Sequence, residues 1–375
     1  MRRSLLLVTV SLAAFLALCA LHGLPMADLL VYRAEGAAVL GGRDLYGFTV
    51  TEWHLPATYP PFAAILFTPL VWLPVPVLKA AFLAGNLLLL GLLIGLSGRL
   101  VGRRLPLSLL CAGTALALWL EPIFQTLLFG QINLALVCLV LWDLTRAPGA
   151  RGRGVAIGIA AGIKLTPAVF LVHLALRGRY REAAAGLAAF AGTVVVGGLV
   201  LPGASGGFWT RHLYETGRVG KAWIVDNQSL QGLVARALGD PEPGVVWAVP
   251  ALVAAVAGLW LVRRAAQERT AVLLTAGTAL LVAPISWSHH WVWCVPLLVV
   301  ALAEGRRGGA VLLGVVFTGR TMWLVPHRGE LDLRLPWWQQ AAASPYALLV
   351  LGLIAYGVVV QLSARRSSAS MIRYA

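Results

Sequence analysis

Apolar segments close to 20 residues long recur along the chain, separated by short polar stretches. We predict membrane-spanning helices at 5–21, 79–98, 183–201, 246–262 and 345–363. A run of about 20 apolar residues is long enough to cross the hydrocarbon core of a bilayer as an α-helix. Strict alternation in runs of about ten residues, which is typical of membrane β-barrels, does not occur. The pattern therefore predicts an all-α polytopic membrane protein.

Further apolar segments bring the predicted total to about 11–12 transmembrane helices. These segments are 105–120, 132–145, 270–286, 290–303 and 309–325. Residues 154–176 have arginines at both ends, so this segment should cross the membrane twice or not at all. Because it is short, we expect a tight helical hairpin or a re-entrant pair, with Lys164 near its tip.

Residues 61–75 are apolar but interrupted by prolines. Pro61, Pro69 and Pro74 lie within them and Pro76 follows. Proline removes a backbone donor and disfavours a regular spanning helix. We therefore expect a short helix lying at the membrane interface, with the second crossing only after it.

The composition supports the membrane assignment and orients it. Of 375 residues, 59% are hydrophobic and 12% charged, whereas soluble domains carry about 25% charged residues. The net charge of +15 comes from Lys and Arg clustered in short loops, which is typical of the cytoplasmic side. We therefore expect a cell (plasma) membrane protein with both termini cytoplasmic, and we exclude nucleic acid as a partner.

We expect a single transmembrane domain over residues 1–375, since no internal repeat is visible. A first outer loop with interfacial helices spans 23–77, and a second large outer loop spans 202–245. Residues 364–375 form a cytoplasmic tail.

The first outer loop concentrates acidic residues, with four of the 15 in the chain between 23 and 60. Asp28 follows the first span directly and stands four residues before Tyr32. A carboxylate beside a reacting hydroxyl can act as a general base. An ordinary solvated acid, or an Asp at a helix N-terminus, is the alternative. Asp44, in a turn, is the competing acid, and a structural role is favoured for it.

Three cationic or titratable groups lie in apolar surroundings. Lys164 needs an anion there, either a carboxylate such as Asp28 or Glu121, or a phosphate. His289 and His290 are adjacent, so on a helix their side chains point about 100° apart and cannot readily share one metal ion. We expect them to bind a phosphate or a sugar. No cluster of ligands is visible, so we expect no metal and no other cofactor.

Amide side chains form two groups that suit sugar hydroxyls. Gln131 and Asn133 make up one group, and Asn227 and Gln228 the other. Helix capping by Asn133 or Asn227 is the alternative. On the predicted topology, the first group falls at the outer ends of spans together with Tyr59.

Short motifs follow one another in order over about the first 300 residues. They are Asp28-Leu29-Leu30-Val31-Tyr32, Asp44-Leu45-Tyr46, Tyr59-Pro60-Pro61-Phe62, Gly130-Gln131-Ile132-Asn133, Ile163-Lys164-Leu165-Thr166-Pro167, Asn227-Gln228-Ser229-Leu230 and Ser286-Trp287 with His289-His290. Each is weak alone, but in this order they resemble the polyprenol-phosphate-mannose-dependent mannosyltransferases of glycosyltransferase family 87, in the GT-C superfamily. The last 75 residues carry no such motif.

The resemblance implies a GT-C type helical bundle and an inverting glycosyl transfer at the outer membrane face. The donor would be a polyprenyl-phosphate sugar carrying mannose, and the acceptor a glycolipid or a lipoglycan. Membrane lipids would surround both substrates. No nucleotide would be used, which agrees with the lack of a nucleotide-sugar motif.

The resemblance also implies roles for individual residues. Asp28 would be the general base that deprotonates the acceptor hydroxyl. Lys164 and His289 or His290 would contact the donor phosphate. The residues expected to bind the sugar or the acceptor are Tyr32, Tyr59, Gln131, Asn133, Asn227 and Gln228.

Two alternatives stay open at this point. Arabinofuranosyltransferases with polyprenyl-phosphate donors resemble the same family, so the donor sugar is not decided. A transporter or flippase for a lipid-linked sugar is the other alternative. Transport would be favoured by inverted repeats with broken helices in matching halves, whereas the chain has one broken segment and its polar groups on one side.

Overall fold

The computed structural model describes residues 2–373, and almost all regular structure in this range is helical. The single sheet within it pairs β1 (Thr49–Val50) antiparallel with β2 (Leu55–Pro56). The chain forms two compact units. The first comprises the residues up to Gly220 together with Ser288–Gly319, and the second comprises Lys221–Trp287 and the residues from Arg320 onward.

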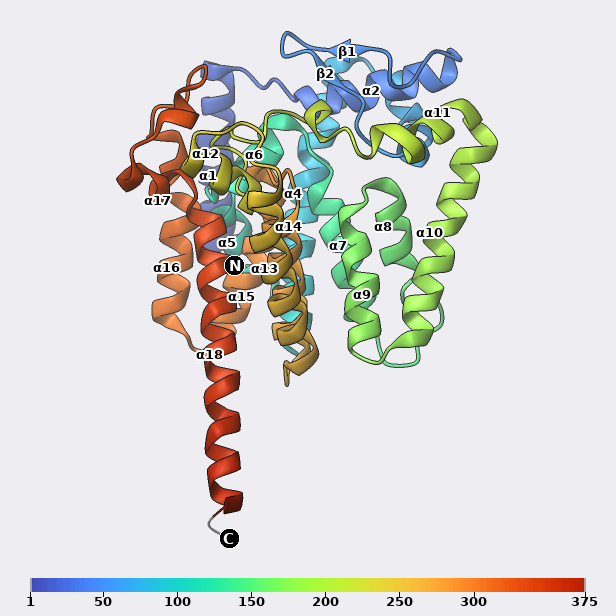
Figure 1. Ribbon diagram of the computed structural model, residues 1–375. Coiled ribbons are helices and arrows are strands. Elements are labelled where there is room, and N and C mark those ends of the chain that lie inside the picture. The colour runs from blue at the N-terminus through green and yellow to red at the C-terminus, as the bar shows by residue number, and fades with distance from the viewer. Residues whose placement is uncertain (1, 374–375) are drawn as a thin grey trace. The chain divides into compact units, whose positions relative to one another are not determined.

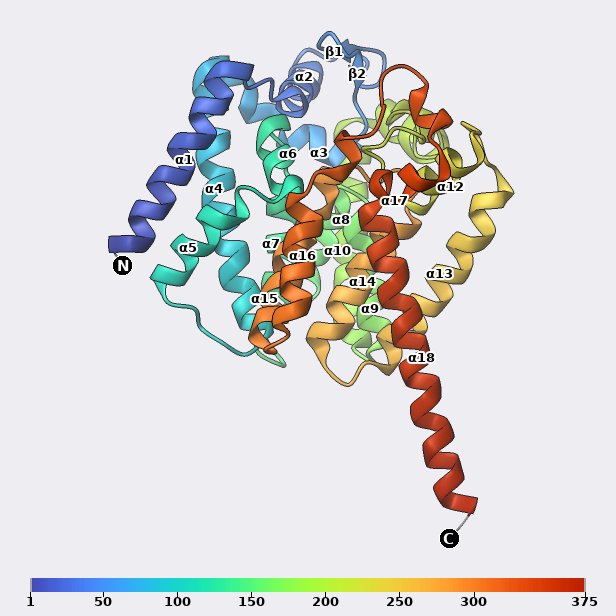
Figure 2. The same ribbon diagram turned by 90° about the vertical axis from the view of Figure 1, so that its left-hand side faces the viewer.

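Five helices of the described range are long and apolar enough to cross a membrane. They are α1 (Arg2–His22), α4 (Val75–Leu100), α10 (Tyr180–Val200), α13 (Val245–Arg264) and α18 (Pro345–Arg373). A sixth possible span is the pair α5 (Leu107–Ala117) and α6 (Glu121–Phe129), which is bent by 81°. In the first unit, α1 and α4 each lie beside α5 (Figure 2). The chain is therefore an all-α, multi-pass membrane protein, as predicted.

Other predicted crossings are shorter in the structure. α7 (Asn133–Leu144), α9 (Val169–Leu176) and α15 (Cys294–Ala303) belong to apolar helical segments of 10–17 residues. At about 1.5 Å per residue such segments do not reach across a hydrocarbon core of about 30 Å. α14 (Glu268–Val282) and α16 (Arg307–Thr318) also fall below the usual length. The total of about 11–12 crossings stays a prediction.

The residues between the predicted spans 105–120 and 132–145 form a helix of their own. This helix is α6, with Pro122 in its first turn. Proline is favoured at that position because its missing N–H would have no partner there. Gly130 ends the helix with φ 67°, a left-handed conformation that favours glycine.

The first outer loop contains α2 (Ala27–Leu40), the β1–β2 hairpin, α3 (Pro61–Leu66) and the 3₁₀ helix η1 (Thr68–Trp72). The two short helices confirm that residues 61–75 do not form a spanning helix. Each carries a proline at its N-terminus. Figure 1 shows α2 and the hairpin as a layer above α7 and α10.

Residues 154–176 form two short helices joined near Lys164, which agrees with the predicted hairpin or re-entrant pair. α8 (Val155–Ile163) ends at Lys164, and η2 (Thr166–Ala168) leads into α9. Asp143 Oδ2 accepts hydrogen bonds from the amides of Ala156 and Ile157, at 3.0 and 3.3 Å, and so caps the start of α8. The three helices α8, α9 and α10 lie side by side (Figure 1).

Contact between α8 and α10 depends on small residues. A Cβ added to Gly158 would lie 2.1 Å from the carbonyl oxygen of Gly186, and one added to Gly162 would lie 2.1 Å from Thr193 Oγ1. Helices in a membrane associate through such close backbone approach. This contact fixes the hairpin, and with it the position of Lys164.

The second outer loop, predicted over 202–245, is divided between the two units. α11 (Pro202–Gly207) and the π-helix η3 (Phe208–His212) belong to the first unit, and α12 (Leu230–Leu238) to the second. In the second unit, the buried guanidinium of Arg236 donates to the carbonyl oxygens of Trp223, Ile224 and Asn227 and to Ser344 Oγ. The second unit also contains η6 (Thr321–Trp323), η7 (Leu331–Arg334), η8 (Trp337–Gln339) and α17 (Gln340–Ala343).

We predict that Gly158→Ala destabilises the protein, because the added methyl group overlaps the backbone of α10. Overpacking of this kind lowers the free energy of unfolding by about 1–3 kcal/mol. Thermal unfolding of the purified protein in detergent measures the effect. Gly192→Ala is the matched control, since nothing lies within 4 Å of its added Cβ. It should raise stability by up to about 1 kcal/mol through helix propensity. Equal midpoints for the two variants would contradict the packing argument.

Candidate functional site

Asp28 occupies the first turn of α2, at a point that two other contacts hold in place. Met26, two residues before Asp28, is buried. Its φ of 46° is an uncommon conformation for a residue other than glycine. Its amide donates to the carbonyl of Leu128 at 3.0 Å. A Cβ on Gly130 would lie 2.9 Å from Leu29 Cβ. The start of α2 is therefore seated on the end of α6.

Tyr32, one turn after Asp28, joins a buried cluster of hydroxyl and amide groups. Its hydroxyl lies 2.9 Å from that of Tyr59, and it donates to Gln131 Oε1 at 3.0 Å. The Tyr59 hydroxyl also lies within hydrogen-bond distance of Gln131 Oε1, at 3.3 Å. The Tyr32 ring stacks on Phe67. This cluster joins α2, the loop before α3 and the loop before α7.

Lys164 lies at the centre of a second cluster. Its Nζ donates to Asn133 Oδ1 at 3.0 Å, lies 3.2 Å from His290 Nε2 and sits 5.3 Å from the centre of the Tyr59 ring. An ammonium group only donates hydrogen bonds, so His290 Nε2 must accept and its proton belongs on Nδ1. Tyr59 connects this cluster to the first one.

The backbone of His289 is held by hydrogen bonds, but the nitrogens of its ring have no hydrogen-bond partner within the described residues. Its carbonyl oxygen accepts from Asn133 Nδ2 at 2.9 Å and from Thr126 Oγ1 at 3.2 Å. The ring is 5% exposed, yet neither nitrogen has a hydrogen-bond partner among the described residues. It lies edge-on to Phe129 and perpendicular to His290. A buried polar group without a partner is rare and often marks a binding site.

The Asp28 charge acts on the groups around it. It lies within electrostatic reach of Lys164, Tyr32 and Tyr59. Burial raises the pKa of Tyr32 and of Tyr59 well above the ordinary value, and the Asp28 charge raises both further. The two hydroxyl groups therefore stay neutral. The site combines one half-buried carboxylate with one ammonium, which suits proton abstraction next to an anion.

Glu35 belongs to the same face of α2, seven residues after Asp28, and the sequence analysis missed it. It is 1% exposed, and no hydrogen bond to its carboxyl oxygens meets ordinary geometry within the described residues. Burial raises the pKa of Glu35 well above its ordinary value, the backbone amide of Thr58 opposes the rise, and the Asp28 charge adds to it. The spacing i, i+4, i+7 of Asp28, Tyr32 and Glu35 was the signal in the sequence that could have revealed it.

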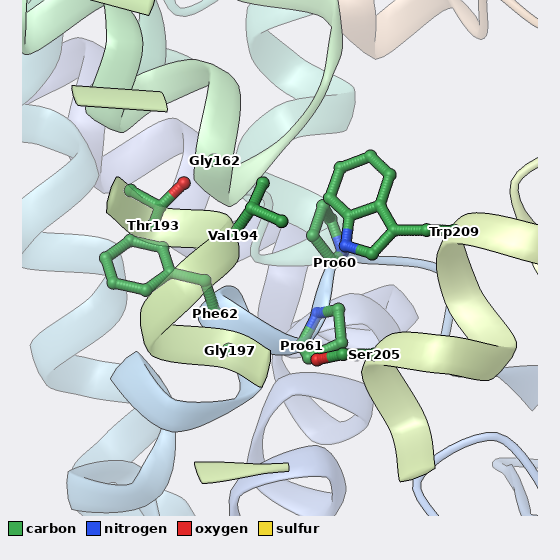
Figure 3. Close-up of a pocket in the computed structure, with 9 residues that line it drawn as sticks. All are labelled: Pro60, Pro61, Phe62, Gly162, Thr193, Val194, Gly197, Ser205 and Trp209. Atoms are coloured by element: carbon green, nitrogen blue, oxygen red, sulfur yellow. The ribbon is translucent and has the colours of Figure 1, made fainter. Parts of the chain in front are cut away.

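A small pocket is lined by residues of which some are close neighbours of the two clusters in the sequence. Figure 3 shows the residues that line it. Its lining is mostly apolar and includes Pro60, Pro61, Phe62, Val194 and Trp209, together with the hydroxyl groups of Thr193 and Ser205. Pro60 follows Tyr59 directly, and Gly162, which also lines the pocket, stands two residues before Lys164.

The structure brings together eight of the ten residues predicted for the site. They are Asp28, Tyr32, Tyr59, Gln131, Asn133, Lys164, His289 and His290, and all belong to the first unit. Asp44 has the favoured structural role, since its Oδ1 accepts from the amide of Tyr46 at 3.0 Å.

Asn227 and Gln228 belong to the second unit and are completely buried. Asn227 Nδ2 donates to the carbonyls of Ala222 and Pro284, and its Oδ1 accepts from the amides of Ser229 and Ser286. Gln228 Nε2 donates to the carbonyls of Val225 and Ala343, and its Oε1 accepts from the amide of Tyr346. Every polar atom of both amides already has a backbone partner. Their sugar-binding role stays an untested prediction, and the observed contacts give them a scaffolding role.

Comparison with known proteins gives a consistent result. A model of glycosyltransferase family 87 matches residues 57–284. A "polyprenol-phosphate-mannose-dependent alpha-(1-2)-phosphatidylinositol mannoside mannosyltransferase" of Mycobacterium tuberculosis is 36% identical, with 91% of this chain and 87% of the relative covered. The protein of the same name from Mycolicibacterium smegmatis is 33% identical, with 87% and 83% covered. A "phosphatidylinositol pentamannoside mannosyltransferase" of M. tuberculosis, also polyprenol-phosphate-mannose-dependent, is 35% identical, with 84% and 75% covered. No solved structure gives a significant match.

We predict that Glu35→Gln stabilises the protein at pH 8 and leaves its stability nearly unchanged at pH 4. Because the pKa of Glu35 is raised in the folded state, its ionisation opposes folding, and stability is lost as the pH rises from about 4.5 through the raised value. The amide of Gln carries no charge and should abolish this loss. Thermal unfolding of both proteins across this pH range measures the difference. Glu52→Gln, which changes an exposed acid of the same loop, is the control. Parallel pH profiles for wild type and Glu35→Gln would show that Glu35 does not behave as a buried acid.

Proposed function

The chain belongs to glycosyltransferase family 87, and from this premise we propose that it transfers mannose from a polyprenyl-phosphate donor to a phosphatidylinositol mannoside. The relatives of known name, which cover most of the chain, support the donor and the acceptor class. The observation that carries the proposal is that Lys164, which contacts His290, lies within electrostatic reach of the Asp28 carboxylate. A lipid phosphate needs a fixed cation, and an acceptor hydroxyl needs a base.

Asp28 acts as the general base in this proposal. It takes the proton from the acceptor hydroxyl while the hydroxyl oxygen forms a bond with the anomeric carbon of mannose. The bond from that carbon to the phosphate oxygen breaks, and its electron pair stays on the polyprenyl phosphate. Attack from the face opposite the leaving group inverts the configuration. The seat of α2 on α6 keeps the base in place, and such positioning contributes strongly to rate.

Lys164 and the two histidines receive the donor phosphate. Negative charge develops on the phosphate as the sugar leaves, so a cation held beforehand at that point favours the transition state. Asn133 fixes Lys164 through its Oδ1 and fixes His289 through its Nδ2. The ring nitrogens of His289 are available to the ligand.

The Tyr32–Tyr59–Gln131 cluster is the part of the site that we assign to the transferred sugar. It presents neutral hydroxyl and amide groups next to the Asp28 carboxylate, and such groups orient sugar hydroxyls without adding charge. Asn133 completes this group. The basic clusters support a site on the extracytoplasmic side of the plasma membrane, with both termini in the cytoplasm.

The names of the relatives favour mannose over arabinose as the donor sugar. Transport of a lipid-linked sugar would require no base. The experiments below therefore separate the two classes of function.

We predict that wild-type protein transfers radiolabelled mannose from polyprenyl-phosphate mannose to a phosphatidylinositol mannoside, and that Asp28→Asn lowers kcat about 10²–10⁴-fold. An amide cannot accept the proton, and general base catalysis contributes roughly 10²–10⁴-fold. The amount of mannosylated acceptor formed in detergent solution measures the rate of transfer. A transporter would form no such product. Asp44→Asn, at the structural turn, should keep most of the activity. Undiminished turnover by Asp28→Asn would move the base to another acid.

We predict that Lys164→Met raises the KM for the donor and lowers kcat, with kcat/KM reduced about 10²–10³-fold. The methionine side chain has a similar length but no charge to place against the phosphate. Steady-state kinetics with the donor varied measure the effect. The control is Lys79→Met, since Lys79 donates to the carbonyl of Leu24 and has no part in the clusters. Equal kinetic effects of the two substitutions would argue against a phosphate contact at Lys164.

A further inference from the structure

We propose that Trp53, in the β1–β2 hairpin, binds a mannose ring of the acceptor next to the sugar that is extended. This inference rests on the proposed function, because it names the part of the site that recognises the acceptor. An indole offers a flat apolar face to the apolar face of a pyranose and contributes contact area at low entropic cost. The site so formed would select acceptors that carry more than one sugar.

The hairpin presents Trp53 in a way that suits a ligand-binding side chain. The tip between β1 and β2 is four residues long, and the Trp53 side chain is 50% exposed. Thr51 and His54 both have positive φ, at 66° and 50°. For a β-branched residue such as Thr51 this conformation is an outlier, and strain of this kind gathers at ligand-binding segments.

A line of aromatic rings leads from Trp53 to the buried site. The indole meets Phe129 edge-on, with ring centres 6.4 Å apart, and Phe129 meets His289 edge-on at 5.6 Å. His289 in turn lies against His290, with ring centres 4.7 Å apart. Phe129 is the last residue of α6, on which Asp28 is seated. The half-exposed ring therefore stands at the outer end of a continuous path to the reacting groups.

A role in anchoring the hairpin to the membrane surface is the competing explanation, since tryptophans gather at membrane interfaces. Trp72 shows the contrast within the same unit. It is 73% exposed, lies on η1 and has no aromatic ring partner within the described part of the chain. Trp53 is tied by Phe129 to the site. The contact with Phe129 favours a sugar over lipid as the occupant.

The test compares Trp53→Ala, Trp53→Phe and Trp72→Ala in steady-state kinetics with donor and acceptor varied separately. We expect Trp53→Ala to raise the KM for the acceptor about tenfold, with the KM for the donor unchanged. Trp53→Phe keeps a flat ring and should restore most of the affinity. Trp72→Ala should stay within about twofold of wild type.

A water-soluble dimannoside separates sugar binding from membrane anchoring. If Trp53 binds sugar, Trp53→Ala raises the KM for the soluble acceptor as much as the KM for the lipid-linked acceptor. If Trp53 anchors the hairpin in lipid, only the KM for the lipid-linked acceptor rises, and the inference is overturned.

Saturation-transfer NMR with the same dimannoside reports binding without turnover. Signal from the wild type that is lost in Trp53→Ala supports the inference even if no transfer is observed, in which case only the proposed function fails. Equal signal from both proteins overturns the inference.

Discussion

The ammonium group of Lys164 is the point on which the arrangement of the first unit depends. A cation in apolar surroundings is costly unless it is paired, and here its neighbours come from separate parts of the chain. Asn133 lies at the start of α7, His290 in η5 (Ser288–Trp293), and Tyr59 in the first outer loop. Asn133 also holds the backbone of His289. One charge therefore requires four segments to meet, and the Asp28 carboxylate, in α2 of the first outer loop, lies within electrostatic reach of it.

Short and broken helices make this meeting possible. In a bundle of uninterrupted spanning helices, the backbone groups would be hydrogen-bonded within each helix. Such a bundle would offer few polar groups at any one depth in the membrane. Here α5 and α6 bend by 81°, and α8 stops at Lys164. Helix ends free polar side chains and backbone groups, and at membrane depth such ends are tolerated where they are buried in protein or line a cavity. The glycine contacts between α8 and α10 fix the height at which Lys164 is presented.

Much of this could be predicted from the sequence, and the exceptions have physical reasons. Charge parity and proline positions correctly predicted that residues 61–75 do not span and that 154–176 form a hairpin. Eight of the ten predicted site residues meet because rare polar groups in apolar segments must find one another. Asn227 and Gln228 carry the same side chains but serve the backbone of the second unit, and amide chemistry does not distinguish a sugar from a carbonyl. The helical spacing of Asp28, Tyr32 and Glu35 places Glu35 on the same face of α2 as Asp28. It went unnoticed because its burial depends on the packing of the first outer loop, and the spacing alone does not show that this face is buried.

A structure of the protein with polyprenyl monophosphate bound would test the central claim most directly, because that molecule carries the phosphate without the sugar. We predict that the phosphate lies within hydrogen-bond distance of Lys164 Nζ and of a histidine ring of the His289–His290 pair, with the Asp28 carboxylate facing the position of the missing sugar. A phosphate bound elsewhere, for example at the exposed Arg211 of η3, with Lys164 still in contact with Asn133 and His290, would contradict it.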